Sequence, residues 1–388
     1  MTANQPFSPS AAIDTALIKI DANLATFARL CPDDTSINNI YYPRKRPGRY
    51  EDGANTGWTT GFWPGMLWLA YEWSGDEKYH QAADVQMESF AERMLNKVDV
   101  DHHDLGFLYS LTAIAAYRLT GNESARDLGL ETARTLMNRY WEKPGIIQAW
   151  GRMDDPDQKG RTIVDSLMNL PLLYWASQIT GDERFYNAGL RHAHQLQRYF
   201  VRPDQTTYHT YYFDTDTGAP KFGKTAQGFA DESCWARGQA WAIYGFPLSY
   251  AYTSDASFLD TASKLADYFI THIPSDGVVY WDLAFGDGSG EEKDSSASAI
   301  AACGILELAK GLPEGERKEK YLQSAQCSVE ALATHYTSRN LPESNALILH
   351  GVYSKPVGAG VNEANLWGDY FYLEALMRLA RPDWEMYW

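Results

Sequence analysis

One short motif recurs along this chain, each time at the junction between two segments with helical apolar periodicity. Clear copies lie at 71–77, 117–123 and 177–183, with a weaker copy at 251–256 and a degenerate one at 312–316. Glycine tolerates the left-handed conformation that ends a helix, and a following Asp or Asn caps the next helix by accepting from its free amides. The motif therefore predicts tight turns between consecutive helices.

The spacing of these turns predicts a closed ring of helical hairpins. The junction residues lie 46, 60, 73 and 61 residues apart, at Gly75, Gly121, Gly181, Ser254 and Gly315. A helix over 11–30 opens the series, and a further hairpin is expected over 358–380. Six hairpins close as an all-α (α/α)6 barrel. The alternative is an open solenoid, although solenoid repeats usually keep stricter periods.

The segments between hairpins are long, and function is expected to collect on that side of the ring. These loops are predicted at 38–61, 96–106, 141–162, 201–235, 274–297 and 339–367. They are rich in aromatic and polar residues of the kind that stack on sugar rings. Four other tryptophans lie in helical apolar periods and are expected in the core: Trp63, Trp68, Trp73 and Trp175.

The composition restricts partners and compartment. Lys and Arg number 34 against 50 Asp and Glu, a formal charge of −16, so nucleic acid is not an expected partner. The four cysteines lack CxxC spacing and read as buried thiols, and neither a leader peptide nor a membrane-spanning run occurs. We expect a single domain over 1–388 with a flexible tail at 1–10, located in the cytoplasm and without a membrane partner.

Asp165 is the first candidate catalytic residue. It interrupts a strongly apolar segment, 161–175, which is expected to be helical. Burial favours the neutral form of a carboxyl group and raises its pKa, as a general acid working near neutral pH requires. The simpler alternative is an ion pair with Arg161, and the residues alone leave both open.

Asp104 is the second candidate, because it directly precedes a predicted helix. Its simpler role is an N-cap. Asp294 also reads as a helix cap, and Asp369 as a cap or a ligand, so spacing alone does not choose the pair of acids that a glycosidase needs. The adjacent His102 and His103 do not indicate a metal site, because neighbouring side chains seldom converge on one ion.

Six motifs in order closely resemble the unsaturated glucuronyl hydrolases of glycoside hydrolase family 88. They lie at 101–110, 145–151, 164–173, 235–241, 294–299 and 367–376. The resemblance implies an (α/α)6 barrel with no metal and no organic cofactor. It also implies hydration of the Δ4,5-unsaturated uronic acid at the non-reducing end of oligosaccharides left by polysaccharide lyases.

The resemblance also implies roles for individual residues. Asp165 matches the general acid and base, and Asp104 the second essential acid. The expected substrate-binding residues are Trp58, His103, Trp150, His209, Gln227, Trp235, Arg237, Trp241 and Tyr353. The chain departs from the family at Ala226, where some members have His, and 353–356 do not align with the cluster of sulfate-preferring members, so sulfate preference stays open.

Two other functions remain as alternatives from the residues. A sugar 2-epimerase on a similar toroid would use paired histidines, for which His103 and His209 could serve. A non-catalytic oligosaccharide-binding protein would use the aromatic loops alone, although a buried Asp165 is costly where only binding is needed. A monomer and a homodimer fit the sequence equally.

Overall fold

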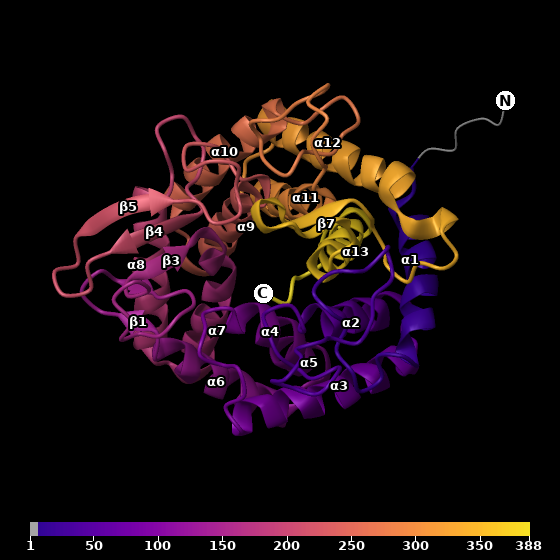
Figure 1. The fold of residues 1–388 in the computed structure, drawn as a ribbon, viewed down its shortest axis with the longest axis horizontal. Helices are drawn as coiled ribbons and strands as arrows, with labels where there is room; N and C mark the ends of the chain where they lie inside the picture. The colour runs from indigo at the N-terminus through magenta and orange to yellow at the C-terminus, as the bar shows by residue number, and fades with distance from the viewer. Residues whose placement is uncertain (1–6) are drawn as a thin grey trace.

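The computed structural model describes residues 7–388, which form a closed ring of helices (Figure 1). Six helical segments line the inside of the ring and six cover the outside. The inner segments are α2 (Phe62–Ser74), α4 with α5 (Leu105–Tyr109 and Ala115–Thr120, joined by a π-helical turn), α7 (Leu170–Thr180), α9 (Ala236–Thr253), α11 (Ser295–Lys310) and α13 (Leu366–Ala380). The outer helices are α1 (Pro9–Leu24), α3 (Glu77–Leu95), α6 (Glu123–Met137), α8 (Glu183–Tyr199), α10 (Ala256–Thr271) and α12 (Glu316–Ala331). This is the predicted (α/α)6 barrel.

The tight turns have the predicted chemistry. Gly75, Gly121 and Gly181 adopt φ of 69°, 71° and 71° and end the inner helices α2, α5 and α7. The next residue then caps the outer helix with its side chain, as Asp76 does by accepting from the amide of Lys78. Ser254 takes the same left-handed conformation at the fourth turn. The fifth junction differs, because α11 ends before the residue predicted to terminate it.

The ring closes in a way that the sequence prediction missed. Instead of a hairpin over 358–380, the structure has a strand and the single inner helix α13, which packs against α1 from the other end of the chain (Figure 1). The predicted tail at 1–10 falls partly outside the described residues, and Ser8 and Pro9 already cap and begin α1.

Short antiparallel strands decorate the long loops on one end of the ring. β1 (Tyr140–Trp141) pairs with β2 (Ile146–Ile147), and β6 (Gly351–Ser354) with β7 (Ala359–Glu363). The third sheet has the order β3 (Arg161–Ile163), β4 (Thr210–Phe213) and β5 (Pro220–Lys224). Its β3–β4 pairing joins the loops that follow α6 and α8, which brings their functional residues together.

The other end of the ring is filled by aromatic side chains. Residues after α13 turn back under the ring, and the buried indole of Trp388 stacks on Phe371 with centroids 5.8 Å apart. Its centroid also lies 5.8 Å from that of Phe107 on the opposite inner helix. Because this end is packed, a ligand reaches the centre of the ring from the loop end.

Burial follows the sequence expectation for most of the apolar residues. Trp63, Trp68 and Trp175 are buried, and Trp73 is half-buried. Among the cysteines, Cys327 is exposed instead of buried. Over residues 7–388, no helix is both long and apolar enough to cross a lipid bilayer.

Candidate active site

A cavity of about 280 Å³ opens among the long loops at the centre of the ring. Every predicted site residue except His103 lines it, and the lining also includes two residues that were not predicted to bind substrate, Ile163 and Ala226. These side chains come from five of the long loops and from α9. Ala226 was noted only as a departure from the family, and Ile163 is one apolar residue among many, so no sequence signal marks it.

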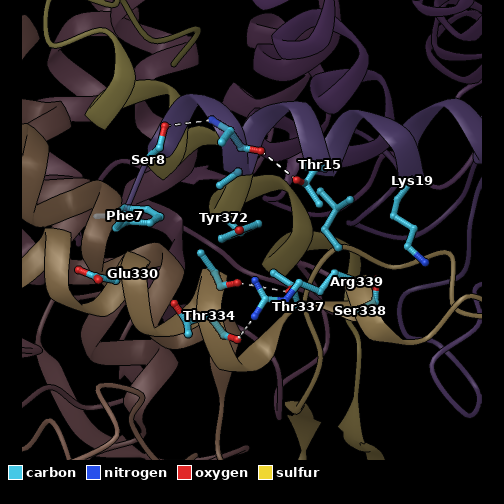
Figure 2. A pocket seen from close by; sticks show the side chains of 15 residues that line it. Phe7, Ser8, Thr15, Lys19, Glu330, Thr334, Thr337, Ser338, Arg339 and Tyr372 are labelled. Carbon is cyan, nitrogen blue, oxygen red and sulfur yellow. Dashed lines mark hydrogen bonds between the residues drawn. The ribbon is translucent and has the colours of Figure 1, made fainter. Parts of the chain in front are cut away.

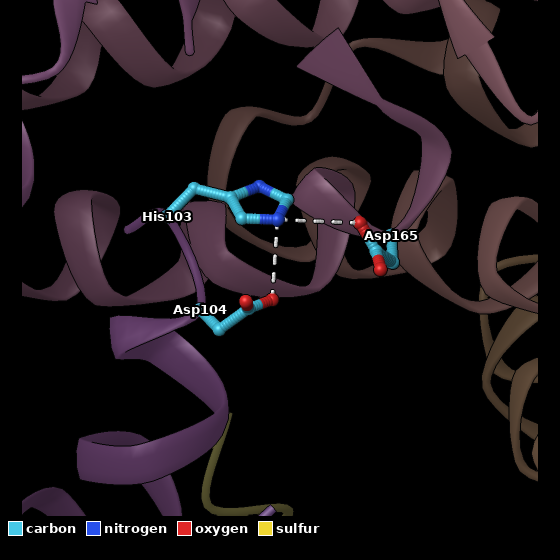
Figure 3. A group of neighbouring side chains, drawn as sticks. All are labelled: His103, Asp104 and Asp165. Atoms are coloured by element: carbon cyan, nitrogen blue, oxygen red, sulfur yellow. Dashed lines mark ion pairs between the residues drawn. The ribbon is translucent and has the colours of Figure 1, made fainter. Parts of the chain in front are cut away.

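Asp104 and Asp165 lie together in this cavity, with His103 between them (Figure 3). His103 Nε2 lies 3.2 Å from Asp104 Oδ1 and 3.7 Å from Asp165 Oδ1. Asp104 precedes α4 but makes no side-chain capping bond to it. Arg161, the alternative partner of Asp165, instead lies against Trp150, with its guanidinium carbon 4.1 Å from the indole centroid. Neither simpler role is therefore found.

Asp165 lies in a 3-10 turn, Val164–Asn169, instead of the predicted helix. The turn begins directly after β3. The amide of its first residue, Val164, donates to the carbonyl of His209 at 3.0 Å and so ties the turn to the neighbouring loop. Asp165 thus stands at the junction between a strand and the inner helix α7, with its carboxyl group at the cavity wall.

The two acids have opposite pKa shifts. Burial, and then the charge of Asp104, raise the pKa of Asp165 well above its usual range, although Arg237 opposes this. Burial would also raise the pKa of Asp104, but nearby cationic groups, Arg139 among them, hold it below its usual range. The shifts therefore favour the protonated form of Asp165 and the ionised form of Asp104, which is the division of roles that an acid and a charge stabiliser require.

His103 lies behind the acids and not in the cavity wall. Its side chain is fully buried, and neither ring nitrogen has a hydrogen-bond partner among residues 7–388. Burial lowers the pKa of His103 to about 4, so its imidazole is neutral at pH 7. His103 does not line the cavity, and its contact with substrate stays a prediction.

His209 is a neutral hydrogen-bond donor at the cavity wall. Its Nδ1 accepts from the amides of Ala226 and Gln227, at 3.0 and 3.2 Å. Burial lowers the pKa of His209 to about 3, so the one ring proton resides on Nε2. An imidazole held in this form donates to a substrate oxygen and does not act as a base.

Arg237 is buried in a set of interactions within the protein. It pairs with Asp294 at 2.9 Å and donates to the carbonyls of Val352 and Tyr353. Its guanidinium carbon lies 4.5 Å from the centroid of Trp235 and 5.0 Å from that of Trp367. Asp294 neutralises the charge of Arg237. Arg237 could therefore bind an anionic group through its directed N–H donors more than through net charge.

Aromatic side chains form the rest of the wall. Trp58 Nε1 donates to the Tyr353 hydroxyl at 3.1 Å, and the carbonyl of Tyr353 accepts from Gln227 Nε2 at 3.0 Å. Trp235 and Trp241 are nearly buried, whereas Trp150 is 37% exposed. Trp150 is therefore the indole with the most surface free to stack on a sugar ring.

His103, Asp104 and Asp165 could also offer ligand atoms to a cation. One nitrogen or oxygen from each lies within 4.8 Å of the others, and within the described part of the chain no second group of this kind occurs. Metal ligands must be deprotonated, so a cation here would compete with the proton on Asp165.

A second cavity, of about 380 Å³, lies between α1 and α12 at the seam where the ring closes (Figure 2). Lys19 Nζ donates to the carbonyls of Leu341 and Ser344, and Arg339 donates to that of Thr334. Glu330 is the one acid in its lining, so this cavity lacks the pair of acids found in the first.

Comparison with protein families matches residues 36–381 to the model described as Glycosyl Hydrolase Family 88. The chain belongs to glycosyl hydrolase family 88. The protein is thus a glycoside hydrolase, and the family that its six motifs resemble is confirmed.

Named relatives cover nearly all of the family 88 chain. The unsaturated chondroitin disaccharide hydrolase of Streptococcus pneumoniae is 42% identical over 378 residues, 97% of this chain and 93% of the relative. The unsaturated glucuronyl hydrolase of Bacillus sp. strain GL1 is 46% identical over 334 residues, 86% and 89% of the two chains. The crystal structure of unsaturated glucuronyl hydrolase from Streptococcus agalactiae superposes with a TM-score of 0.93 at 43% identity, covering 98% and 93%.

Proposed function

We propose that Asp165 and Asp104 carry out hydration of a Δ4,5-unsaturated uronic acid at the non-reducing end of an oligosaccharide. The observation that supports this most is that Asp165 and Asp104 line one cavity, with the pKa of Asp165 raised by burial and by the charge of Asp104. Protonation of carbon requires an acid that holds its proton near neutral pH, in a site where water is scarce.

The proposed reaction consumes one water. Asp165 gives its proton to C4, and the positive charge that develops at C5 and the ring oxygen is stabilised by the carboxylate of Asp104. Asp165, now ionised, takes a proton from water as the water oxygen bonds to C5. The resulting hemiketal opens between C5 and the ring oxygen, and collapse at C1 expels the remaining sugar and leaves a 5-keto sugar acid.

The substrate class is proposed from the relatives together with the cavity. Three streptococcal relatives are named unsaturated chondroitin disaccharide hydrolases. One solved mutant from Streptococcus agalactiae is described as complexed with dGlcA-GalNAc6S, and another solved relative with dGlcA-Glc-Rha-Glc. The family 88 chain offers such substrates Trp150 for stacking, with His209 and Arg237 as donors at the cavity wall.

The test is the loss of ultraviolet absorbance when the conjugated double bond is hydrated. Wild type should bleach an unsaturated chondroitin disaccharide, and a panel of sulfated, unsulfated and lyase-derived bacterial oligosaccharides then ranks substrates. Asp165→Asn should abolish bleaching, whereas Asp157→Asn, a control in the loop that leads to Asp165 with an exposed side chain, should keep it. If wild type bleaches no member of the panel, the proposed hydration is wrong.

The two alternative functions predict different results in this assay. An epimerase would keep the chromophore and would tolerate Asp165→Asn, but the tautomer of His209 makes it a donor and not the base that such a mechanism needs. A binding protein would retain oligosaccharide without product. A cytoplasmic location and a monomeric or dimeric state stay predictions from the sequence.

A further inference from the structure

The turn that carries Asp165 is fixed from behind by a residue of the outer ring. His192, on α8, is fully buried, and its Nε2 lies 2.7 Å from the hydroxyl oxygen of Ser166, the residue next to Asp165. The Ser166 hydroxyl in turn lies 2.6 Å from the carbonyl oxygen of Ile163, at the end of β3. The amide of Ile147, in β2, donates to His192 Nδ1 at 2.8 Å.

The hydrogen bonds that link Ile147, His192, Ser166 and Ile163 allow only one consistent assignment of donors and acceptors. An amide can only donate, so His192 Nδ1 accepts and bears no proton. Burial, and then the nearby His103, lower the pKa of His192 to about 3, so its single proton is on Nε2. His192 therefore donates to Ser166, and the Ser166 hydroxyl donates to the carbonyl of Ile163.

The carboxyl group of Asp165 has little else to orient it. Its Oδ1 is buried without a hydrogen-bond partner among the described residues. The groups that face it are Asp104, His103 and Arg237, of which His103 approaches to only 3.7 Å. The backbone of its own turn therefore sets the direction of the carboxyl group. The Ser166 hydroxyl holds that turn, because it accepts from His192 Nε2 and donates to the carbonyl of Ile163.

We propose that His192 and Ser166 are positioning residues that aim the carboxyl group of Asp165 at the substrate. Neither residue lines the cavity, and both act through the turn. This inference rests on the proposed function. Displacement of a catalytic group by about 1 Å can cost a hundredfold in rate. Loss of these hydrogen bonds is therefore expected to lower kcat more than it changes KM.

The test uses Ser166→Ala and His192→Phe, singly and together, in the full chain. Each single variant is expected to lower kcat about tenfold, with KM within about twofold. The double variant should be no slower than the single variants, because all three break the same series of hydrogen bonds. His192→Gln, which keeps a donor toward Ser166, should recover part of kcat. His194→Asn, on the same helix with an exposed side chain, is the control and should match wild type.

The pH profile separates positioning from simple stability. A loosened turn admits water to Asp165, which lowers its pKa, so the basic limb of kcat/KM should move to lower pH in both single variants. A role confined to stability would lower the midpoint of unfolding and leave kcat and this limb unchanged at temperatures well below it. That result, or fully additive losses in the double variant, would overturn the proposal.

Histidine ¹⁵N spectra test the hydrogen-bond chain without substrate. Neutral His192 protonated on Nε2 is expected from pH 8 down to about 5, whereas a proton on Nδ1 or a charged ring at pH 6 would contradict the proposal. If wild type is inactive toward every unsaturated oligosaccharide, the proposed function fails and the positioning role falls with it. The spectra would still show whether the hydrogen bonds of His192 exist.

Discussion

Asp294→Asn should destabilise the protein far more than an ordinary surface Asp→Asn substitution. Asp294 has two roles: Oδ1 caps α11 by accepting from the amides of Ser296 and Ala297, and Oδ2 pairs with Arg237 at 2.9 Å. Asparagine keeps the capping oxygen but places an amide donor against the guanidinium. Both partners are buried, with side chains 0% and 1% exposed, so the substitution leaves a buried charge unpaired.

The expected loss follows from that burial. Breaking a buried ion pair by removing one partner costs about 3 to 5 kcal/mol. With an unfolding entropy of about 2.1 cal/mol/K per residue, 388 residues give about 0.8 kcal/mol/K. A loss of about 4 kcal/mol therefore lowers Tm by about 5 °C, measured by circular dichroism and checked by urea titration.

Asp182→Asn is the matched control for this experiment. Asp182 also caps a helix, α8, and also pairs with an arginine, Arg184, but the arginine side chain is 85% exposed. Surface pairs contribute about 0 to 1 kcal/mol and asparagine is an equally good cap, so Tm should change by about 1 °C or less. If Asp294→Asn costs no more than Asp182→Asn, the reasoning about the buried pair is wrong.

Three further predictions concern the acids themselves. Asp104→Asn removes the charge that helps raise the pKa of Asp165, so any activity that remains should be lost at lower pH than in wild type, as a kcat/KM profile would show. A raised pKa in the folded state stabilises the protein below the unfolded pKa of about 3.9 and loses that stabilisation as pH rises through the folded value. Asp165→Asn should therefore raise Tm relative to wild type most at alkaline pH, and an equal change at pH 4 and pH 8 would contradict this. Gly106→Ala places a Cβ 2.5 Å from the Cα of Asn169, which forces apart the segments that carry the two acids, so both Tm and kcat should fall, by about 1 to 3 kcal/mol in stability.

The features predicted well from the sequence are those determined by neighbouring residues. A glycine followed by Asp or Asn ends one helix and caps the next at three of the five junctions, and Ser254 with Asp255 adopts the same geometry at a fourth. The long loops followed from the same pattern, and so did the side of the ring on which the site lies. The identity of the site residues came from motifs and not from periodicity.

The features that were missed depend on contacts between distant segments. The pairing of α1 with α13 leaves no local signal, so a sixth hairpin was expected where one helix stands. The segment around Asp165 begins as a 3-10 turn and not as a helix, because the amide of Val164 is bonded to the distant carbonyl of His209. The burial of His103 likewise depends on the tertiary structure, and apolar periodicity cannot reveal it.

The closure of the ring by α1 and α13 has a consequence for biosynthesis. Of the helices in the ring, α1 leaves the ribosome first, and α13, which packs against it, leaves last. Until then α1 and the inner face of α2 lack one neighbour, and that unfinished edge is exposed to other chains. Contacts between the two ends of a sequence also slow folding, because a long loop must close before they form. The last step of folding is thus expected to be the docking of α13 against α1, α2 and α11, which closes the ring.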